Sequence, residues 1–331
     1  MKMDLKKISE KISMMGFESL TQEEKNALKS FGTQNGIREF LSKVSIEQIV
    51  MKSEEFHALN VKKLTDEELF NALMNAISFD IDDSGSKISF LMPRGVSFPG
   101  GTKFYKIRTL DKGDDNFPLK TMSKEQDAWN APREKCKLGR LNKDGESLLY
   151  TSIQSPNACV EEMNIRDGER FCLIVYEAKK DIKATLIGIW QDDPQLSKEE
   201  NLKMRMITNV LSDFFTRDVG EGTEFLYRAS ERIAKDYYDL PPECQDAWCY
   251  SSVAAKQGHN CCFRPDVARK VLNLLGVQVC SVNRKDDAYY YKCECILVWN
   301  NDKGVYDYYN VDSPMCRRLF PEIMAESLPL G

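Results

Sequence analysis

The stretch Gly139–Glu161 combines residue types that could bind an anion at one end and act on a sugar at the other. It begins with a Gly-Arg-x-Asn turn that carries Arg140, continues through a short apolar strand to Tyr150, and ends at Glu161. Guanidinium groups bind phosphate through a planar fork of N–H donors, and glycine turns let backbone N–H groups approach a ligand. A carboxylate beside an electron-poor sugar carbon can stabilise the positive charge that forms as a glycosidic bond breaks. The stretch therefore predicts a site for an anionic ligand.

Each of these residues also has an ordinary explanation. Arg140 and Arg108, which lies at the end of an earlier strand, are two of 46 lysines and arginines, so both fit surface residues as well as a phosphate site. Glu161 has small and apolar neighbours, which would raise its pKa or require a partner. It also fits an exposed helix glutamate like Glu162 beside it. The residue types alone leave both interpretations open.

A second polar cluster lies in the segment 247–260. Tyr250, Ser252 and Asn260 would offer hydroxyl and amide groups to a ligand near the end of a strand. A nucleophilic serine would need a Gly-x-Ser-x-Gly elbow and a partner base. The segment lacks the elbow, and His259 is the only base nearby. The cluster therefore predicts ligand binding rather than a serine hydrolase.

The cysteines and histidines do not form a metal-binding pattern. The chain has 11 cysteines without a C-x-x-C pair, and its only histidines are His57 and His259. A structural zinc site would need two paired ligand hooks. We therefore expect no metal and no resident cofactor, and we expect reduced thiols that pack as small apolar residues.

Composition and charge limit the classes of protein to which the chain could belong. The 331 residues are 42% hydrophobic and carry a net charge of -5, which favours a folded protein and argues against a nucleic-acid binder with a basic surface. No window approaches a membrane span in length and apolarity, and the basic N-terminus has no apolar run behind it. The sequence predicts a cytoplasmic protein that binds neither membrane nor nucleic acid directly.

Residues 1–95 are expected to form a small helical region. Thr21 with Glu24, and Thr65 with Glu68, match the capping box that begins many helices. After Thr65, apolar residues recur at three- and four-residue steps and define one helix face. That apolar face could serve a homodimer.

Residues 96–331 are expected to form an α+β domain after a connecting segment over 80–100, where Asp, Ser, Gly and Pro accumulate. The run 171–178 is almost continuously apolar, as in a strand buried on both faces. Strands and helices are mixed rather than strictly alternating, which favours a mixed sheet with flanking helices over a doubly wound sheet. The predicted strands cover 104–110, 148–152, 171–178, 183–190, 277–282, 289–299 and 305–311, and the predicted helices cover 202–214, 224–238 and 264–275.

The order and spacing of these motifs resemble the RES-domain family over about residues 100–310. The family's aromatic-Arg-x-Arg strand is matched by Phe104–Arg108, with Lys106 where many members have the first arginine. Its Gly-Arg-x-Asn-x-x-Gly turn is matched by Gly139–Gly145. The further matches are Trp129–Pro132, Leu149–Tyr150, Ala158 with Glu161, Tyr250–Ser252, Gly258–Asn260, Phe263 and the helix over 227–233.

The resemblance implies a fold similar to that of ADP-ribosyltransferases and an activity that splits the nicotinamide–ribose bond of NAD with water or phosphate. Many members are toxins of bacterial toxin–antitoxin pairs, so the expected protein partner is a helix-turn-helix antitoxin. Arg108 and Arg140 would then hold the pyrophosphate. Tyr150 would stack on the nicotinamide or ribose, and Glu161 would orient the ribose and stabilise positive charge. The expected catalytic residues are Glu161, Arg108 and Ser252, and the expected substrate-binding residues are Arg140, Asn142, Tyr150, Tyr250 and Asn260.

Two other functions remain open on the sequence. The chain could transfer ADP-ribose from NAD to a protein target. Because Lys106 departs from the family pattern, the chain could also be a catalytically inactive module that binds NAD without turning it over.

Overall fold

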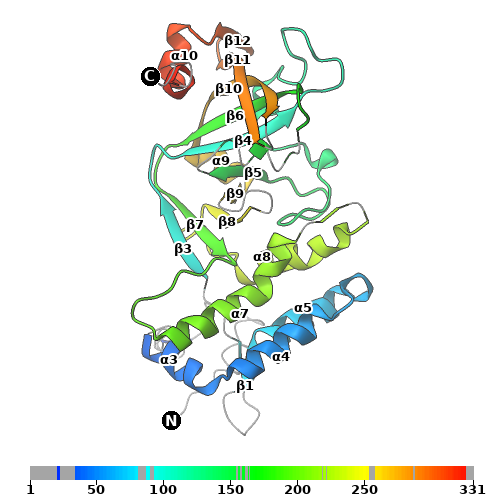
Figure 1. Ribbon diagram of the computed structural model, residues 1–331, viewed down its shortest axis with the longest axis vertical. Coiled ribbons are helices and arrows are strands. Elements are labelled where there is room, and N and C mark those ends of the chain that lie inside the picture. Colours follow the sequence, from blue (N-terminus) through cyan, green and yellow to red (C-terminus); the bar gives the residue numbers. More distant parts are fainter. Residues whose placement is uncertain are drawn as a thin grey trace. The chain divides into compact units, whose positions relative to one another are not determined.

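The computed structural model describes residues 21–22, 34–80, 87–89, 93–153, 156, 159–160, 163, 165–217, 219–220, 222–252, 258–285 and 288–325. Within these residues the protein is α+β, with helices and one large mixed sheet, so the expected class is confirmed (Figure 1). The chain divides into two compact units. The first unit consists of Met1–Met92 and Gly188–Phe214, and the second consists of Pro93–Ile187 and Phe215–Gly331.

Helices build most of the first unit. Thr65 starts one of them with the predicted capping box, because its backbone N–H donates to Glu68 Oε2 at 2.8 Å and Glu68 N–H donates to Thr65 Oγ1 at 3.2 Å. The other predicted box includes Glu24, which lies outside the described residues. The elements are α3 (Gln34–Lys43), α4 (Ile46–His57), a 3-10 turn at Val61–Lys63, α5 (Asp66–Ala76), the strands β1 (Ser78–Asp80) and β2 (Lys87–Ser89), and α7 (Lys198–Thr216), which extends into the second unit.

The core of the first unit joins the N-terminal helices to α7. Phe40 and Phe79 meet edge to face with ring centroids 5.8 Å apart, and Ile207 of α7 is buried in the same cluster. Lys203 of α7 donates to the Leu41 carbonyl at 3.0 Å. The helical unit therefore includes a segment, Gly188–Phe214, that begins 96 positions after Met92.

A ten-stranded sheet dominates the second unit, in the order β12-β11-β10-β6-β4-β5-β9-β8-β7-β3 (Figure 1). The β7–β8 pair is parallel and the other described pairs are antiparallel. The strands are β3 (Arg94–Phe98), β4 (Lys103–Thr109), β5 (Leu149–Ile153), β6 (Arg170–Ala178), β7 (Ile182–Ile187), β8 (Ala247–Ser251), β9 (His259–Phe263), β10 (Leu272–Lys285), β11 (Ala288–Asn300) and β12 (Val305–Asn310).

Short helices accompany this sheet. Pro265 stands at the start of α9, where its missing N–H leaves no helical hydrogen bond unmade. Cys316 of the C-terminal helix α10 and Phe320, the residue that follows α10, are buried against the sheet. The helices are α8 (Tyr227–Tyr237), α9 (Pro265–Val271), α10 (Pro314–Leu319) and α11 (Pro321–Ala325), with 3-10 turns at Glu125–Ala128, Arg133–Lys135 and Glu224–Leu226.

Strand β6 has a continuous apolar sequence because both faces of the sheet are covered. Its side chains alternate between two hydrophobic cores. One core receives Ile174 and Tyr176, and the other receives Leu173 and Val175. Each such buried side chain contributes about 1.5–3 kcal/mol relative to an exposed one. The prediction of a fully buried strand over 171–178 is therefore confirmed.

Two predictions of local structure are wrong. Residues 94–98, assigned to a connecting segment, form β3, because they pair with Ile182–Leu186 of β7. The helix expected over 264–275 ends at Val271. Residues 272–274 instead pair with 176–178 of β6, so long-range strand pairing overrides the local helical pattern.

The strands β4 and β5 separate after a short ladder, and this separation positions the candidate site. Among the described residues they pair at Phe104 with Ile153 and at Tyr105 with Ser152, and at no other position. On its other edge β4 stays paired with β6 along Lys103–Thr109. The second half of β4 therefore has a ladder on one edge only.

Candidate functional site

Four polar side chains form a row across β4, β5, β9 and β8. Tyr105 lies opposite Ser152, Ser152 lies opposite Asn260, and Asn260 lies opposite Tyr250. Residues directly opposite one another project from the same face of a sheet. The row therefore joins residues that are up to 155 positions apart in the sequence on one face.

This row borders a cavity of about 240 Å³, which we call the strand cavity. The cavity lies where β4 and β5 separate, and it includes two residues of the segment that follows β5. Its described lining residues are Tyr105, Lys106, Ile107, Tyr150, Thr151, Ser152, Cys159, Met163, Tyr250 and Asn260.

A buried hydrogen bond fixes the centre of the row. Ser152 Oγ donates to Asn260 Oδ1 at 2.8 Å, and the two residues are 2% and 7% exposed. This bond sets the orientation of the Asn260 amide, because its carbonyl oxygen is engaged by the serine. Sequence reasoning missed Ser152, although its position two residues after Tyr150 places both side chains on one face of β5.

Tyr150 connects the strand cavity to the Gly-Arg-x-Asn loop. Its hydroxyl accepts a hydrogen bond from Leu141 N–H at 3.1 Å and donates to Asn142 Oδ1 at 2.8 Å. Burial raises the pKa of Tyr150 well above its ordinary value, so the hydroxyl stays neutral. Tyr150 lines the cavity, and its hydroxyl is hydrogen-bonded to the loop. The expected stacking of Tyr150 on a ligand is compatible with these contacts.

Asn142 holds the loop itself. Its Nδ2 donates to the carbonyls of Lys137 and Lys143 at 2.8 and 2.9 Å, and the side chain is buried. A Cβ on Gly139 would lie 2.5 Å from Asn142 Oδ1, so only glycine fits the close approach at this position. Asn142 therefore stabilises the turn and is not among the described residues that line the strand cavity.

The two arginines expected to bind pyrophosphate are held by other parts of the chain. Arg108 donates to the Asp127 carbonyl at 2.8 Å and pairs with its carboxylate at 3.2 Å. Arg140 donates to the Arg217 carbonyl at 2.9 Å and lies over the Tyr227 ring, 5.4 Å from its centroid. Neither arginine is among the described lining residues of the strand cavity.

Lys106 is the cationic side chain in that lining. Its ammonium group donates to the Trp129 carbonyl. Burial, reinforced by the nearby charge of Arg108, lowers the pKa of Lys106 to about 8. Lys106 thus occupies a drier environment than an ordinary lysine, at the position where the resemblance led us to expect arginine.

Of two further residues expected at the site, Ser252 is not among the described lining residues of the strand cavity. Ser252 is buried, and its backbone N–H donates to the Gly258 carbonyl at 2.9 Å, which continues the β8–β9 pairing beyond Ser251. Glu161 lies outside the described residues. Its sequence neighbours Cys159 and Met163 both line the strand cavity, and the Cys159 thiol donates to the Tyr105 carbonyl at 3.6 Å.

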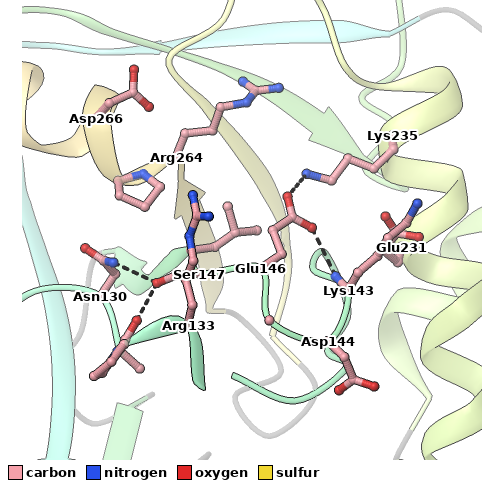
Figure 2. A pocket seen from close by; sticks show the side chains of 15 residues that line it. Asn130, Arg133, Lys143, Asp144, Glu146, Ser147, Glu231, Lys235, Arg264 and Asp266 are labelled. Atoms are coloured by element: carbon pink, nitrogen blue, oxygen red, sulfur yellow. Dashed lines mark hydrogen bonds and ion pairs between the residues drawn. The ribbon is translucent and has the colours of Figure 1, made fainter. Parts of the chain in front are cut away.

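Two larger cavities lie in the same unit. The first, of about 650 Å³, shares Tyr105 with the strand cavity; we call it the side cavity. Lys103 and Lys292 contribute cationic side chains to its lining. The second, of about 900 Å³, is bounded by Lys143–Leu148, α8 and the start of α9; we call it the loop cavity (Figure 2). The loop cavity shares no described lining residue with the strand cavity.

No protein-family model matches the chain, and comparisons with curated proteins and with solved structures found no match. The described residues contain no group of three or more histidine, cysteine or acidic side chains that could hold a metal ion. Of the helices in the described ranges, none has the length and apolarity needed to cross a membrane.

Proposed function

We propose that the protein cleaves the nicotinamide–ribose bond of NAD, and that the strand cavity receives the nicotinamide end of the dinucleotide. The proposal starts from the resemblance to the RES-domain family. One observation carries it further: parts of four separate motifs line a single cavity. The motif residues concerned are Tyr105, Lys106, Tyr150, Tyr250 and Asn260.

The size of the cavities supports a divided site. The strand cavity, about 240 Å³, is smaller than typical pockets for whole ligands of drug size. It suits nicotinamide with part of its ribose, between the aromatic rings of Tyr150 and Tyr250. The side cavity shares Tyr105 and adds about 650 Å³ beside Lys292 and Lys103, where the pyrophosphate and adenosine can extend. Lys103 pairs at 3.0 Å with Glu322 of the same lining, so a phosphate would compete with that carboxylate.

Cleavage of this bond needs charge stabilisation more than acid catalysis. Nicotinamide leaves as a neutral molecule when the glycosidic electron pair moves onto its ring nitrogen, and the ribose carbon gains positive charge. A carboxylate beside that carbon stabilises the charge. Glu161 takes this role in our proposal, and water or phosphate then adds to the ribose carbon, with one proton released when water adds.

The cationic residues that we expect to contact NAD differ from those that the family resemblance assigns. The resemblance assigns the pyrophosphate to Arg108 and Arg140, whose guanidinium groups are bound to loop carbonyls. Both would have to exchange these partners to reach a ligand. Lys106 would likewise have to release the Trp129 carbonyl, but it already lines the strand cavity, so it is the cation nearest to the proposed ligand.

We also propose a fold, a location and a partner for the enzyme. The fold is an ADP-ribosyltransferase-like sheet preceded by a helical region. The enzyme would act in the cytoplasm as a toxin, inhibited by a helix-turn-helix antitoxin. The helix after Thr65 offers a surface for a homodimer.

The test is NAD turnover by purified protein, with products identified by mass spectrometry. We expect wild-type protein to release nicotinamide and ADP-ribose or its phosphate, and Glu161→Gln to lose at least about 100-fold in rate, as expected for removal of a charge-stabilising group. Glu162→Gln is the matched control and should retain turnover. NAD binding without turnover would show an inactive binding module. If NAD labelled in its ADP-ribose part left label on a protein, the activity would be ADP-ribosyl transfer. Either result would reject the proposal.

A further inference from the structure

The loop cavity contains a buried carboxyl group with an unmet hydrogen-bonding requirement. Glu231 of α8 lines the cavity and is 5% exposed. Its Oε1 is buried and has no hydrogen-bond partner among the residues that the structure describes. Burial raises the pKa of Glu231, and the charges of Lys143 and Lys235 counteract part of this shift. A buried carboxyl oxygen without a partner is costly, so a ligand that donates a hydrogen bond there would stabilise the site.

Cationic side chains surround the same cavity. Lys143 and Arg133 are exposed, and neither side chain forms an ion pair within the described ranges. Lys235 pairs with Glu146 at 2.6 Å, and Arg264 pairs with an aspartate outside the lining. Figure 2 shows Glu231 and Lys235 on α8 facing the loop that carries Lys143 and Glu146. The cavity therefore offers one ligand a hydrogen-bond acceptor, Glu231, and two cations without an ion pair among the described residues, Arg133 and Lys143. Asp144 and Asp266 also line it.

We propose that the loop cavity binds a phosphorylated ribose. Carboxylates recognise ribose by accepting hydrogen bonds from its hydroxyl groups, as Glu231 would do. Lysine and arginine recognise the phosphate dianion, as Lys143 and Arg133 would do. Inorganic phosphate would offer Glu231 only a P–OH group beside its own negative charge, and ribose alone would leave the cations unused. The volume of about 900 Å³ accommodates a sugar phosphate, either free or as part of a nucleotide.

This site is separate from the proposed NAD cleavage. Its described lining residues are not those of the strand cavity, and its ligand is bound rather than broken. Failure of NAD turnover would therefore leave the inference standing, and failure of sugar-phosphate binding would leave the proposed function standing.

Isothermal titration calorimetry on the full chain tests the inference, with ribose 5-phosphate, ribose and inorganic phosphate as probes. We expect ribose 5-phosphate to bind at least about tenfold more tightly than either fragment, because only it uses both the carboxylate and the cations. Equal affinity for inorganic phosphate would identify a simple anion site and overturn the proposal. Absence of ribose 5-phosphate binding would also overturn it.

Two variants locate the binding. Glu231→Gln and Lys143→Ala should each weaken ribose 5-phosphate binding by about tenfold or more, because each removes one charged contact. Lys135→Ala is the matched control: Lys135 is exposed in the same region but is not a lining residue, so its loss should leave affinity unchanged. Lys143 is exposed, so its replacement should leave folding intact even if Glu231→Gln destabilises α8. Unchanged affinity in Lys143→Ala would place the ligand elsewhere and reject the site.

Discussion

The loop Gly139–Gly145 lines the loop cavity through Lys143–Gly145 and bonds to Tyr150 of the strand cavity, yet the two cavities are built differently. The strand cavity is lined by side chains whose neighbours follow from strand register, such as Ser152 opposite Asn260. The loop cavity is lined largely by charged side chains from loops and helix ends, and Lys143 and Glu231 lack fixed partners among the described residues. Strand pairing thus produces a preorganised, mostly uncharged site. The loops produce a site whose charges are left for a ligand to satisfy.

The largest expected effect comes from the loop Gly139–Gly145, which lines the loop cavity and bonds to Tyr150 of the strand cavity. Gly139→Ala should lower the free energy of unfolding by about 3 kcal/mol, because the new Cβ would lie 2.5 Å from Asn142 Oδ1. Asn142 cannot move aside cheaply, since it is buried and hydrogen-bonded to Tyr150 and to two loop carbonyls. Denaturant unfolding measures the change. Gly220→Ala is the control, because nothing lies within 4 Å of a Cβ built there. Equal effects in both variants would mean that the loop is not tightly packed.

The sequence predicted the strand cavity better than the loop cavity for a physical reason. Tyr150, Tyr250 and Asn260 belong to short motifs that could be recognised one at a time, and each lies on a strand of predictable periodicity. Ser152 was missed because its role depends on lying between β4 and β9, and strand order is not encoded in local periodicity. The partner of Arg108, Asp127 of the 3-10 turn Glu125–Ala128, likewise depends on folding that local sequence does not encode.

The fold likewise contains features that local sequence predicts and features that only tertiary packing determines. The buried strand over 171–178 and the capping box at Thr65 follow from local pattern, and both are present. By contrast, the end of α9 at Val271 and the inclusion of Gly188–Phe214 in the helical unit follow from tertiary packing. The lining of the loop cavity comes from four separate segments of the chain, so no single stretch of sequence indicates it.

A pH experiment contrasts the lysines of the two cavities. Burial lowers the pKa of Lys106 to about 8, below the value in the unfolded chain. The unfolded state therefore binds more protons between pH 8 and about pH 10, and the free energy of unfolding should rise with pH across that window by about 2 kcal/mol on account of Lys106. Below pH 8 both states are protonated, and the full cost of burying the charge is present.

The measurement compares wild-type protein with Lys106→Met at both ends of this pH window. The rise in the free energy of unfolding that is due to Lys106 should disappear in the variant. Other titrating groups contribute equally to both proteins. Lys143→Met, at an exposed position in the loop cavity, should keep the wild-type rise. If Lys106→Met and wild-type protein showed the same pH dependence, the ammonium group would be hydrated, and the strand cavity would be wetter than its lining indicates.

The smallest expected effect tests whether the row across the strands is a coupled unit. Ser152→Ala leaves Asn260 Oδ1 buried without its donor, and Asn260→Ala leaves the serine hydroxyl without its acceptor. A double-mutant cycle should therefore give a coupling energy of about 1 kcal/mol, the usual net value of a buried hydrogen bond. The same cycle on Ser147 and Asn130, whose side chains are 2.7 Å apart beside the loop cavity, provides the comparison. Because Ser147 Oγ also donates to the Ala131 carbonyl, it keeps a partner when Asn130 is replaced, so its coupling should be weaker. Equal coupling in the two pairs would show that strand register adds no preorganisation to the strand cavity.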